Sequence, residues 1–437
     1  MRVRGSGLAL VPLYLASAVL TVGEGAFGLL VPLYMHAIGR STVEIGSALS
    51  TYGVVSLAAR IPVGAVYRAQ RAWLLIAGGT VLSSLSFWLL TTTQNPGLLA
   101  AFASLDGAGF AIASTANMAA LLDRRPAGGN AGSIMGWYTG SLGAGYAIAG
   151  VVGGRVGESL GAGHAMRVLA IVPLAAGVLL AAAMRAIPAT AATGEEAAAA
   201  ASPGSSWLRS FRGLPAAVWL AFFVTLYINL VSGVVMSFFP IYGLALGLTV
   251  AQIGFLQGTV HGVAAATVRF FSGIVFRWIS YARALPAMIV LSGLSIAAIG
   301  GIRIFAVLTL AWIGIGLSRG ILRVASAALV MDEAGATDRQ RGAASSVYLA
   351  GLDLGKVLGP IAGGVGAHLA GIRATFLLSS GIFPALYFLL AALAALRRRQ
   401  EAKRAGLPAR STVSDVTGNV SGVPGPRSRG ARVRPRP

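Results

Sequence analysis

Long apolar segments separated by short polar stretches recur along the whole chain. We predict twelve membrane spans, because most of these segments reach the ~20 residues that a helix needs to cross a bilayer. The polar stretch between the sixth and seventh segments, residues 189–213, is rich in Ala, Gly and Ser, which is typical of a flexible linker. The predicted spans cover residues 8–36, 43–67, 72–93, 97–122, 131–154, 164–184, 214–244, 250–276, 284–302, 304–331, 342–368 and 372–396.

The second half of the chain repeats the pattern of the first. An Arg-x3-Gly-x3-Arg motif occurs in each half, and the two copies are 209 residues apart. Over most of the chain, the offset between matching residues drifts only from 208 to 210. This regularity predicts two copies of one six-helix unit with single-residue insertions in loops. The motif comprises Arg60, Gly64 and Arg68 in the first copy and Arg269, Gly273 and Arg277 in the second.

The fold class predicted from this pattern is an all-α membrane protein made of two pseudo-symmetric six-helix bundles. Residues 14–34 match residues 222–242 of the second copy, so we expect the first apolar segment to be retained rather than cleaved as a signal peptide. The predicted divisions are a first bundle (1–188), a cytoplasmic linker (189–213), a second bundle (214–396) and a basic, disordered cytoplasmic tail (397–437).

Composition agrees with a membrane protein. The chain is 56% hydrophobic and 11% charged, which lies far outside the range of soluble globular proteins. Its net charge of +21 raises the question of a nucleic-acid partner. However, 11 of the 34 basic residues lie in the tail after Leu396, where contact with anionic lipid headgroups accounts for them. We therefore expect no nucleic-acid partner.

The distribution of Lys and Arg, the tail included, predicts the orientation in the membrane. On the side that holds both termini and the linker there are 24 Lys and Arg residues, against five on the other side. Cytoplasmic loops carry the excess of Lys and Arg. We therefore expect a multi-pass protein of the cell membrane with both termini in the cytoplasm.

Twelve predicted helices in two homologous sets of six, with a Gly-Arg loop between helices 2 and 3, resemble the major facilitator superfamily. The loop, from Gly64 through Arg68 to Arg71, lacks the acidic residue of the family motif. The Gly-x3-Gly-Pro-x2-Gly-Gly motif that drug/proton antiporters of the family carry in helix 5 is found here in helix 11, from Gly355 to Gly364. The resemblance implies a secondary transporter, monomeric and without a cofactor, that moves a small solute by alternating access.

Three acidic residues lie at membrane depth within the predicted spans: Glu24, Asp106 and Asp353, whereas Glu44 lies at the very start of its span. Charged groups at this depth are costly and mark ion or substrate pathways. In the family, helices 1, 4, 7 and 10 line the central cavity, which is where Glu24 and Asp106 fall. We predict proton or substrate binding at these carboxyls, with packing alone as the alternative. Polar residues on the same helices are further candidates for the site: Thr21, Asn117 and Asn229.

Two arginines one turn apart on helix 10, Arg319 and Arg323, suit a carboxylate or phosphate because each guanidinium offers a planar fork of donors. Charge balance against Asp353, Glu24 or Asp106 is the alternative, and an ion pair across the cavity is one form of it. Lys356 follows Asp353 by three residues, and an intrahelical pair is preferred there over a substrate role. A single histidine in helix 8, His261, is interpreted as structural, with proton transfer as the alternative.

The resemblance also implies a cytoplasmic gate. In the family, Arg–Asp clusters at this place hold the cytoplasmic side closed. The matching acidic residues here are Asp123 and Asp332, at the ends of helices 4 and 10. The predicted gating residues are Arg60, Gly64, Arg68, Asp123, Arg269, Gly273, Arg277 and Asp332.

Other protein classes fit the sequence less well. An enzyme is not expected, because the chain has no Cys, no P-loop and four scattered His without metal-ligand spacing. A channel remains an alternative, although internal duplication favours alternating access. A ligand sensor that does not transport is a third. Among transporters, we favour an organic anion or zwitterion moved with protons, and proton-driven efflux of lipophilic drugs is the alternative.

Overall fold

The computed structural model describes residues 10–124, 131–187, 216–278, 281–333 and 338–404, and in these ranges every regular element is a helix. The predicted linker and the end of the tail lie outside these ranges, as do the side chains of Gly64, Gly273, Arg277 and Asp332. Residues 392–437 form a unit of their own.

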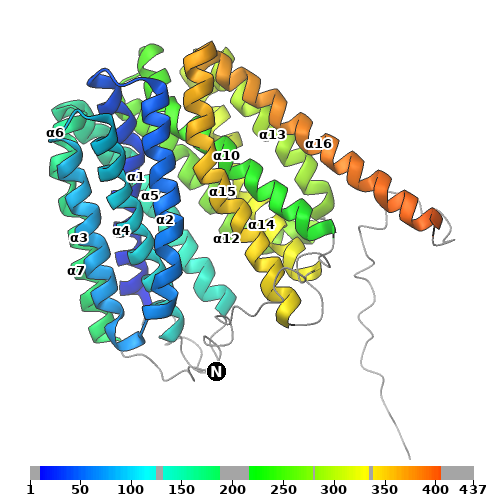
Figure 1. Ribbon diagram of the computed structural model, residues 1–437, viewed down its shortest axis with the longest axis horizontal. Coiled ribbons are helices and arrows are strands. Elements are labelled where there is room, and N and C mark those ends of the chain that lie inside the picture. The colour runs from blue at the N-terminus through cyan, green and yellow to red at the C-terminus, as the bar shows by residue number, and fades with distance from the viewer. Residues whose placement is uncertain (1–9, 125–130, 188–215, 279–280, 334–337, 405–437) are drawn as a thin grey trace, which may run out of the picture. The chain divides into compact units, whose positions relative to one another are not determined.

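The first half of the chain forms one group of helices, shown from blue to cyan-green in Figure 1. Helix α1 packs against α5, α2 against α4, and α3 against α4 and α7. The bounds are α1 (Val11–Ala37), α2 (Thr42–Val66), a short 3-10 turn (Ala69–Arg71), α3 (Ala72–Leu90), α4 (Pro96–Asp123), α5 (Ala131–Leu160), α6 (Ala162–Leu169) and α7 (Ile171–Ala186).

The second half repeats these contacts, since α10 packs against α15, α12 against α14, and α13 against α14. The last helix reaches Arg404, beyond the predicted end of the span at Leu396. The bounds are α10 (Ala216–Ala245), α11 (Val250–Gly254), a π-helix η3 (Phe255–Val260), α12 (His261–Trp278), α13 (Tyr281–Gly301), α14 (Phe305–Glu333), α15 (Asp338–Ala370) and α16 (Ile372–Arg404).

Turns at matching positions bear out the duplication. In the described residues, the backbone takes a positive φ only at glycines, which tolerate it because they lack a Cβ. These four glycines form two pairs related by the repeat, Gly39 with Gly247 and Gly161 with Gly371. The first pair precedes a capping box in each copy, built by Ser41 with Glu44 and by Thr249 with Gln252. The same local chemistry therefore starts the second span of each bundle.

One insertion in the repeat lies inside a helix, so the prediction of loop insertions is wrong at this place. The offset is 208 at Gly46 and Gly254 but 209 at Gly53 and Gly262. Between Gly254 and Gly262 lies the π-helix η3. A π-helix fits an extra residue by shifting hydrogen bonds from i+4 to i+5, and it is often found at functional sites.

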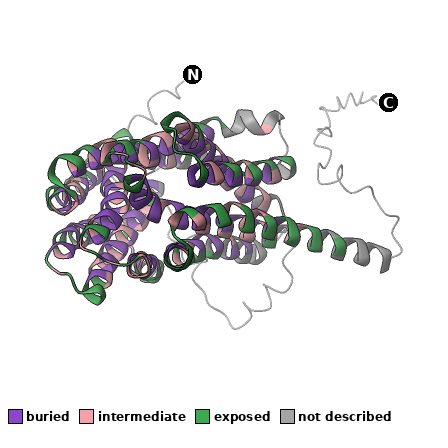
Figure 2. Cartoon of the chain, turned by 90° about the horizontal axis from the view of Figure 1, so that it is seen from above, coloured by how far each residue is buried: buried purple, intermediate pink, exposed green. Residues whose placement is uncertain are grey.

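Eight of the described helical segments are long and apolar enough to cross a membrane. The other four predicted spans correspond to α2, α5, α11–α12 and α15. These four carry most of the contacts between the two bundles, because α2 packs against α15 and α5 against α11, η3 and α12, whereas α1 and α10 touch less extensively. Figure 2 shows buried residues gathered where helices face each other, with exposed residues on the outer sides. Helices that face protein on several sides need less apolar surface than helices that face lipid.

Candidate functional site

An acidic cluster lies inside the first bundle, where α1, α2, α3 and α4 meet. The hydroxyl of Tyr52 on α2 donates a hydrogen bond to Oε1 of Glu24 on α1. Asp106 on α4 interacts with both Glu24 and the Ser83 hydroxyl of α3. Asp106 is 2% exposed, so this carboxyl is removed from solvent. Four helices thus bring two carboxyl groups and two hydroxyls together.

Each carboxyl of this cluster keeps one buried oxygen with no hydrogen-bond partner in the described part of the chain, Oε2 of Glu24 and Oδ2 of Asp106. Two carboxylates side by side in a medium of low polarity repel each other strongly. A proton held between them removes this repulsion and supplies the missing donor. The arrangement is therefore chemically suited to bind and release a proton.

Close packing holds these helices in place. A Cβ added at Gly107, next to Asp106, would lie 2.5 Å from the carbonyl oxygen of Tyr52. A Cβ at Gly109 would lie 2.4 Å from the carbonyl oxygen of Gly79 on α3. Glycine at these positions lets α4 approach α2 and α3 closely enough for the side chains of the cluster to meet.

A group of cations lies at the second bundle. Arg319 and Arg323 on α14 and Arg269 on α12 are within electrostatic range of one another. Tyr146 of α5, in the first bundle, lies within electrostatic range of both Arg269 and Arg319. The arginines therefore lie close to the boundary between the bundles. Nε of Arg319 is buried and has no hydrogen-bond partner among the described residues.

No salt bridge joins Arg319 or Arg323 to a carboxylate among the described residues, where one is seen between Arg40 and Glu44 at 3.5 Å. The alternative of a direct ion pair with Glu24 or Asp106 is therefore not present in this conformation. The acids lie within the first bundle, where they contact each other and neutral hydroxyls.

Lys356 and Asp353 also form no ion pair within 4.0 Å in the part of the chain that the structure describes. Lys356 lies instead in the electrostatic field of both Asp353 and Glu24. Lys356 of the second bundle therefore lies within electrostatic range of the acidic cluster.

Of the other polar candidates, Thr21 and Asn117 link neighbouring helices, and Asn229 bonds within its own helix. The Thr21 hydroxyl donates to the Leu142 carbonyl of α5 at 3.1 Å, and Asn117 donates to Ser17 of α1 at 2.8 Å. Asn229 donates to the Thr225 carbonyl one turn earlier at 2.9 Å. The amide oxygens of Asn117 and Asn229 have no partner among the described residues and remain free to accept a hydrogen bond.

Asp123, one of the predicted gating residues, lies at the end of α4. The Tyr67 hydroxyl donates to Asp123 at 2.6 Å. The neighbouring Arg124 was not predicted as a site residue, and it donates to carbonyls of Ile187, Ala120 and Met184 at 2.7, 3.0 and 3.3 Å. The Arg124 side chain therefore links the end of α4 to the end of α7 by hydrogen bonds.

Tyr52 and Ser83 are the residues of the acidic cluster that sequence reasoning missed. Neither carries a charge, and each lies on a helix that supplied no acidic candidate within the membrane. The repeat offered one indication, because Ser83 has a serine counterpart, Ser292, at an offset of 209. Only the packing of α2 and α3 against α1 and α4 identifies both residues.

Most contacts between the bundles lie in two seams, α2 with α15 and α5 with α11, η3 and α12, and each seam is rich in small residues. In the seam of α2 with α15, Thr42 donates to the Gly364 carbonyl at 3.0 Å and Ser50 to the Val357 carbonyl at 2.7 Å. In the seam of α5 with η3, Thr259 donates to the Ala147 carbonyl at 2.8 Å.

Glycines bring the backbones of both seams into contact. A Cβ at Gly46 would lie 2.5 Å from the Pro360 carbonyl oxygen, and one at Gly150 would lie 2.2 Å from the Gly254 carbonyl oxygen. Near the carboxyl end of α5, the Ala251 amide donates to Glu158 at 2.9 Å across the same seam. Two packed seams related by the repeat are the geometry expected of bundles that rock against each other.

Two duplicated helical bundles with charged groups between apolar helices define a multi-pass membrane protein of the secondary-transporter class. The sequence profile described as Major Facilitator Superfamily matches residues 13–339. The chain belongs to the major facilitator superfamily. Both the family and the fold therefore identify a transporter rather than an enzyme.

Solved structures share this fold. A bacterial homologue of the human lysosomal transporter Spinster, in an inward-facing and unoccupied conformation, aligns with a TM-score of 0.70 and 14% identity over 90% of this chain and 98% of that one. The nucleoside transporter NupG aligns with a TM-score of 0.69 and 14% identity over 88% of this chain and 98% of that one. A search of curated proteins found no match.

Proposed function

We propose that the protein moves a small organic anion or zwitterion across the cell membrane by proton-coupled alternating access. The observation that carries the proposal is the acidic cluster. Glu24 and Asp106 face each other, and each has a buried oxygen without a partner among the described residues. A pair that holds one proton can release it when the surrounding helices move.

The cations at the bundle boundary favour an anionic solute. An unpaired arginine at the centre of a membrane helix costs about 2.5 kcal/mol or more. No carboxylate within 4.0 Å offsets this cost for Arg319 or Arg323 in the described residues. An anionic substrate that binds between the bundles would supply the missing charge, and a lipophilic neutral drug would not.

The two seams support a conformation closed on the side of the α1–α2 turn. If the termini are cytoplasmic, as the distribution of Lys and Arg predicts, this side is the outer one. The described conformation would then be inward-facing, as is the unoccupied Spinster homologue that shares the fold. If the two seams opened, the acidic cluster would become accessible from the side of the α1–α2 turn.

Transport by the purified protein in proteoliposomes tests the proposal. Glu24→Gln and Asp106→Asn should each abolish uptake driven by a pH gradient and leave exchange of substrate across the membrane intact. Gradient-driven uptake at the wild-type rate in both variants would remove the cluster from the mechanism.

The nature of the substrate needs a second measurement. Arg319→Ala and Arg323→Ala should each weaken the binding of an anionic substrate by about tenfold, since a hydrogen bond to a charged group contributes ~1.5 kcal/mol or more. Unchanged binding together with a lower melting temperature would assign the arginines a structural role and favour the efflux of lipophilic drugs.

A further inference from the structure

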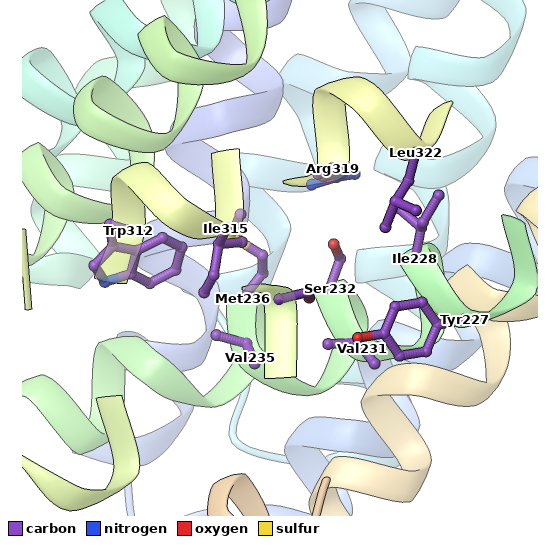
Figure 3. Close-up of a pocket in the computed structure, with 11 residues that line it drawn as sticks. Tyr227, Ile228, Val231, Ser232, Val235, Met236, Trp312, Ile315, Arg319 and Leu322 are labelled. Atoms are coloured by element: carbon purple, nitrogen blue, oxygen red, sulfur yellow. The ribbon is translucent and has the colours of Figure 1, made fainter. Parts of the chain in front are cut away.

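The second bundle contains a small cavity between α10, α13 and α14. Its volume is about 20 Å³, which is room for one water-sized group. Most of its wall is apolar, with Tyr227, Ile315 and Leu322 among the lining residues. Figure 3 shows Arg319 and Ser232 at the cavity, with the Ser232 side chain directed toward Arg319.

This cavity occupies the place in the second bundle that the acidic cluster occupies in the first. Ser232 is the counterpart of Glu24 at an offset of 208, and Ser292 is the counterpart of Ser83 at 209. Ile315 replaces Asp106, also at 209. A hydroxyl and an aliphatic side chain thus stand where the first bundle has two carboxyls. At these positions the second bundle has no acid, and it has a cavity with a mostly apolar wall instead.

The π-helix adds to this difference. The counterpart of Tyr52 at an offset of 209 is His261, which follows η3 directly. His261 is 9% exposed, and its ring lies edge-on to Trp312 with 5.9 Å between the centroids. Trp312 itself lines the cavity. Tyr52 thus binds an acid in the first bundle, whereas its counterpart His261 packs against the aromatic wall of the cavity in the second.

Arg319 gives the cavity a charged rim. Its Nε is buried and has no hydrogen-bond partner among the described residues. Tyr146 of α5 lies within electrostatic range of Arg319, so the charged side of the cavity is the side toward the first bundle. A guanidinium beside an apolar hollow matches a ligand with a carboxylate at one end and a small apolar group at the other.

We propose that this cavity is a substrate subsite that holds the small apolar end of an organic monocarboxylate, whose carboxylate binds Arg319. The proposal rests on the proposed function and narrows its substrate class. In this arrangement the acidic cluster of the first bundle binds the proton, and the repeat-related cavity of the second bundle binds the solute. Each methylene buried in such a site strengthens binding by about fourfold, so cavity size sets the preferred chain length.

Ligand-induced shifts of the melting temperature of the purified full-length protein provide the test. The probes are acetate, butyrate and hexanoate, each compared with its uncharged amide. Wild type should be stabilised by acetate or butyrate more than by hexanoate, and not by the amides. Ile315→Ala widens the cavity and should raise the affinity for hexanoate relative to butyrate by at least ~tenfold, the value of two methylenes.

Ile313→Ala is the matched control, because Ile313 lies on the same helix and does not line the cavity. It should leave the preference for chain length at the wild-type value. Leu322→Ala, which also enlarges the cavity, serves as the second variant if Ile315→Ala does not fold.

The subsite is wrong if the amides stabilise the protein as well as the carboxylates do, or if no carboxylate stabilises it. It is also wrong if the folded cavity variants shift the preference no more than Ile313→Ala does. Proton-coupled transport of another solute by wild type would then leave the proposed function standing. Conversely, the expected binding pattern without gradient-driven transport would retain the subsite and overturn the proton coupling.

Discussion

The hydroxyl of Tyr52 donates a hydrogen bond to the carboxyl group of Glu24, and this bond joins α2 to α1 beside Asp106. It connects the candidate proton site to one of the two seams between the bundles, because α2 also packs against α15. Gly53, the residue after Tyr52, faces the backbone of Lys356, where a Cβ would lie 3.3 Å from the carbonyl oxygen. Tyr52 binds Glu24 and its neighbour Gly53 contacts α15. A movement of α2 relative to α15 would therefore also move the side chain that binds Glu24.

The role of Tyr52 can be tested by removing its hydroxyl. Tyr52→Phe keeps the ring and loses the donor to Glu24, so gradient-driven uptake should fall by about fivefold, equivalent to ~1 kcal/mol. Tyr34→Phe is the control, since Tyr34 lies on α1 outside the cluster. Equal uptake by both variants in proteoliposomes would show that the bond to Glu24 does not assist coupling.

The glycines of the seams should be required for their closure. Gly46→Ala and Gly150→Ala place a Cβ 2.5 and 2.2 Å from a facing carbonyl oxygen, so the backbones must move apart. Cysteines introduced at Ser50 and Val357 report closure, because the Ser50 hydroxyl lies 2.7 Å from the Val357 carbonyl oxygen.

Cross-linking of this cysteine pair should fall severalfold with either alanine. Gly78→Ala is the control, because a Cβ there meets no atom within 4 Å. Cross-linking at full yield in all three backgrounds would show that the seams tolerate side chains and that close backbone contact does not hold them shut.

Arg124 should stabilise the first bundle. Arg124→Ala removes three hydrogen bonds to carbonyls at the ends of α4 and α7, and we expect a loss of about 2 kcal/mol in the free energy of unfolding. Thermal unfolding in detergent measures this loss. Arg71→Ala, at an exposed position, should change the melting temperature little. An Arg124→Ala protein as stable as this control would mean that water replaces the guanidinium at no cost.

The predicted orientation can be tested by cysteine labelling, which this chain allows because it has no native Cys. Gln70→Cys and Gln94→Cys lie at exposed positions at opposite ends of α3. In intact cells, a membrane-impermeant maleimide should label Gln94→Cys, and it should label Gln70→Cys only after the membrane is permeabilised. The reverse pattern would invert the orientation, and with it the assignment of an inward-facing conformation.

The sequence by itself determined the span pattern, the duplication and the charged residues at membrane depth. These features are local, because a bilayer demands apolar length from each span and penalises every charge within it. The turn glycines also follow from local chemistry. Gly39 and Gly247 are matched by the offset of the repeat. Each lies in a turn with a positive φ, which favours glycine because it lacks a Cβ.

Tertiary structure decided which of these groups meet. Glu24 and Asp106 are both candidates from the sequence, but their contact and the part of Tyr52 depend on how α1, α2 and α4 pack. The alternative of ion pairs with Arg319 and Arg323 is not realised among the described residues, because a salt bridge forms only where packing brings opposite charges together, and here the acids stay inside the first bundle. The extra residue of the second copy is predicted in a loop, since sequence spacing cannot distinguish a longer loop from a π-helix. Helical periodicity defines the face on which a residue lies, whereas only the packing of distant segments determines what that face contacts.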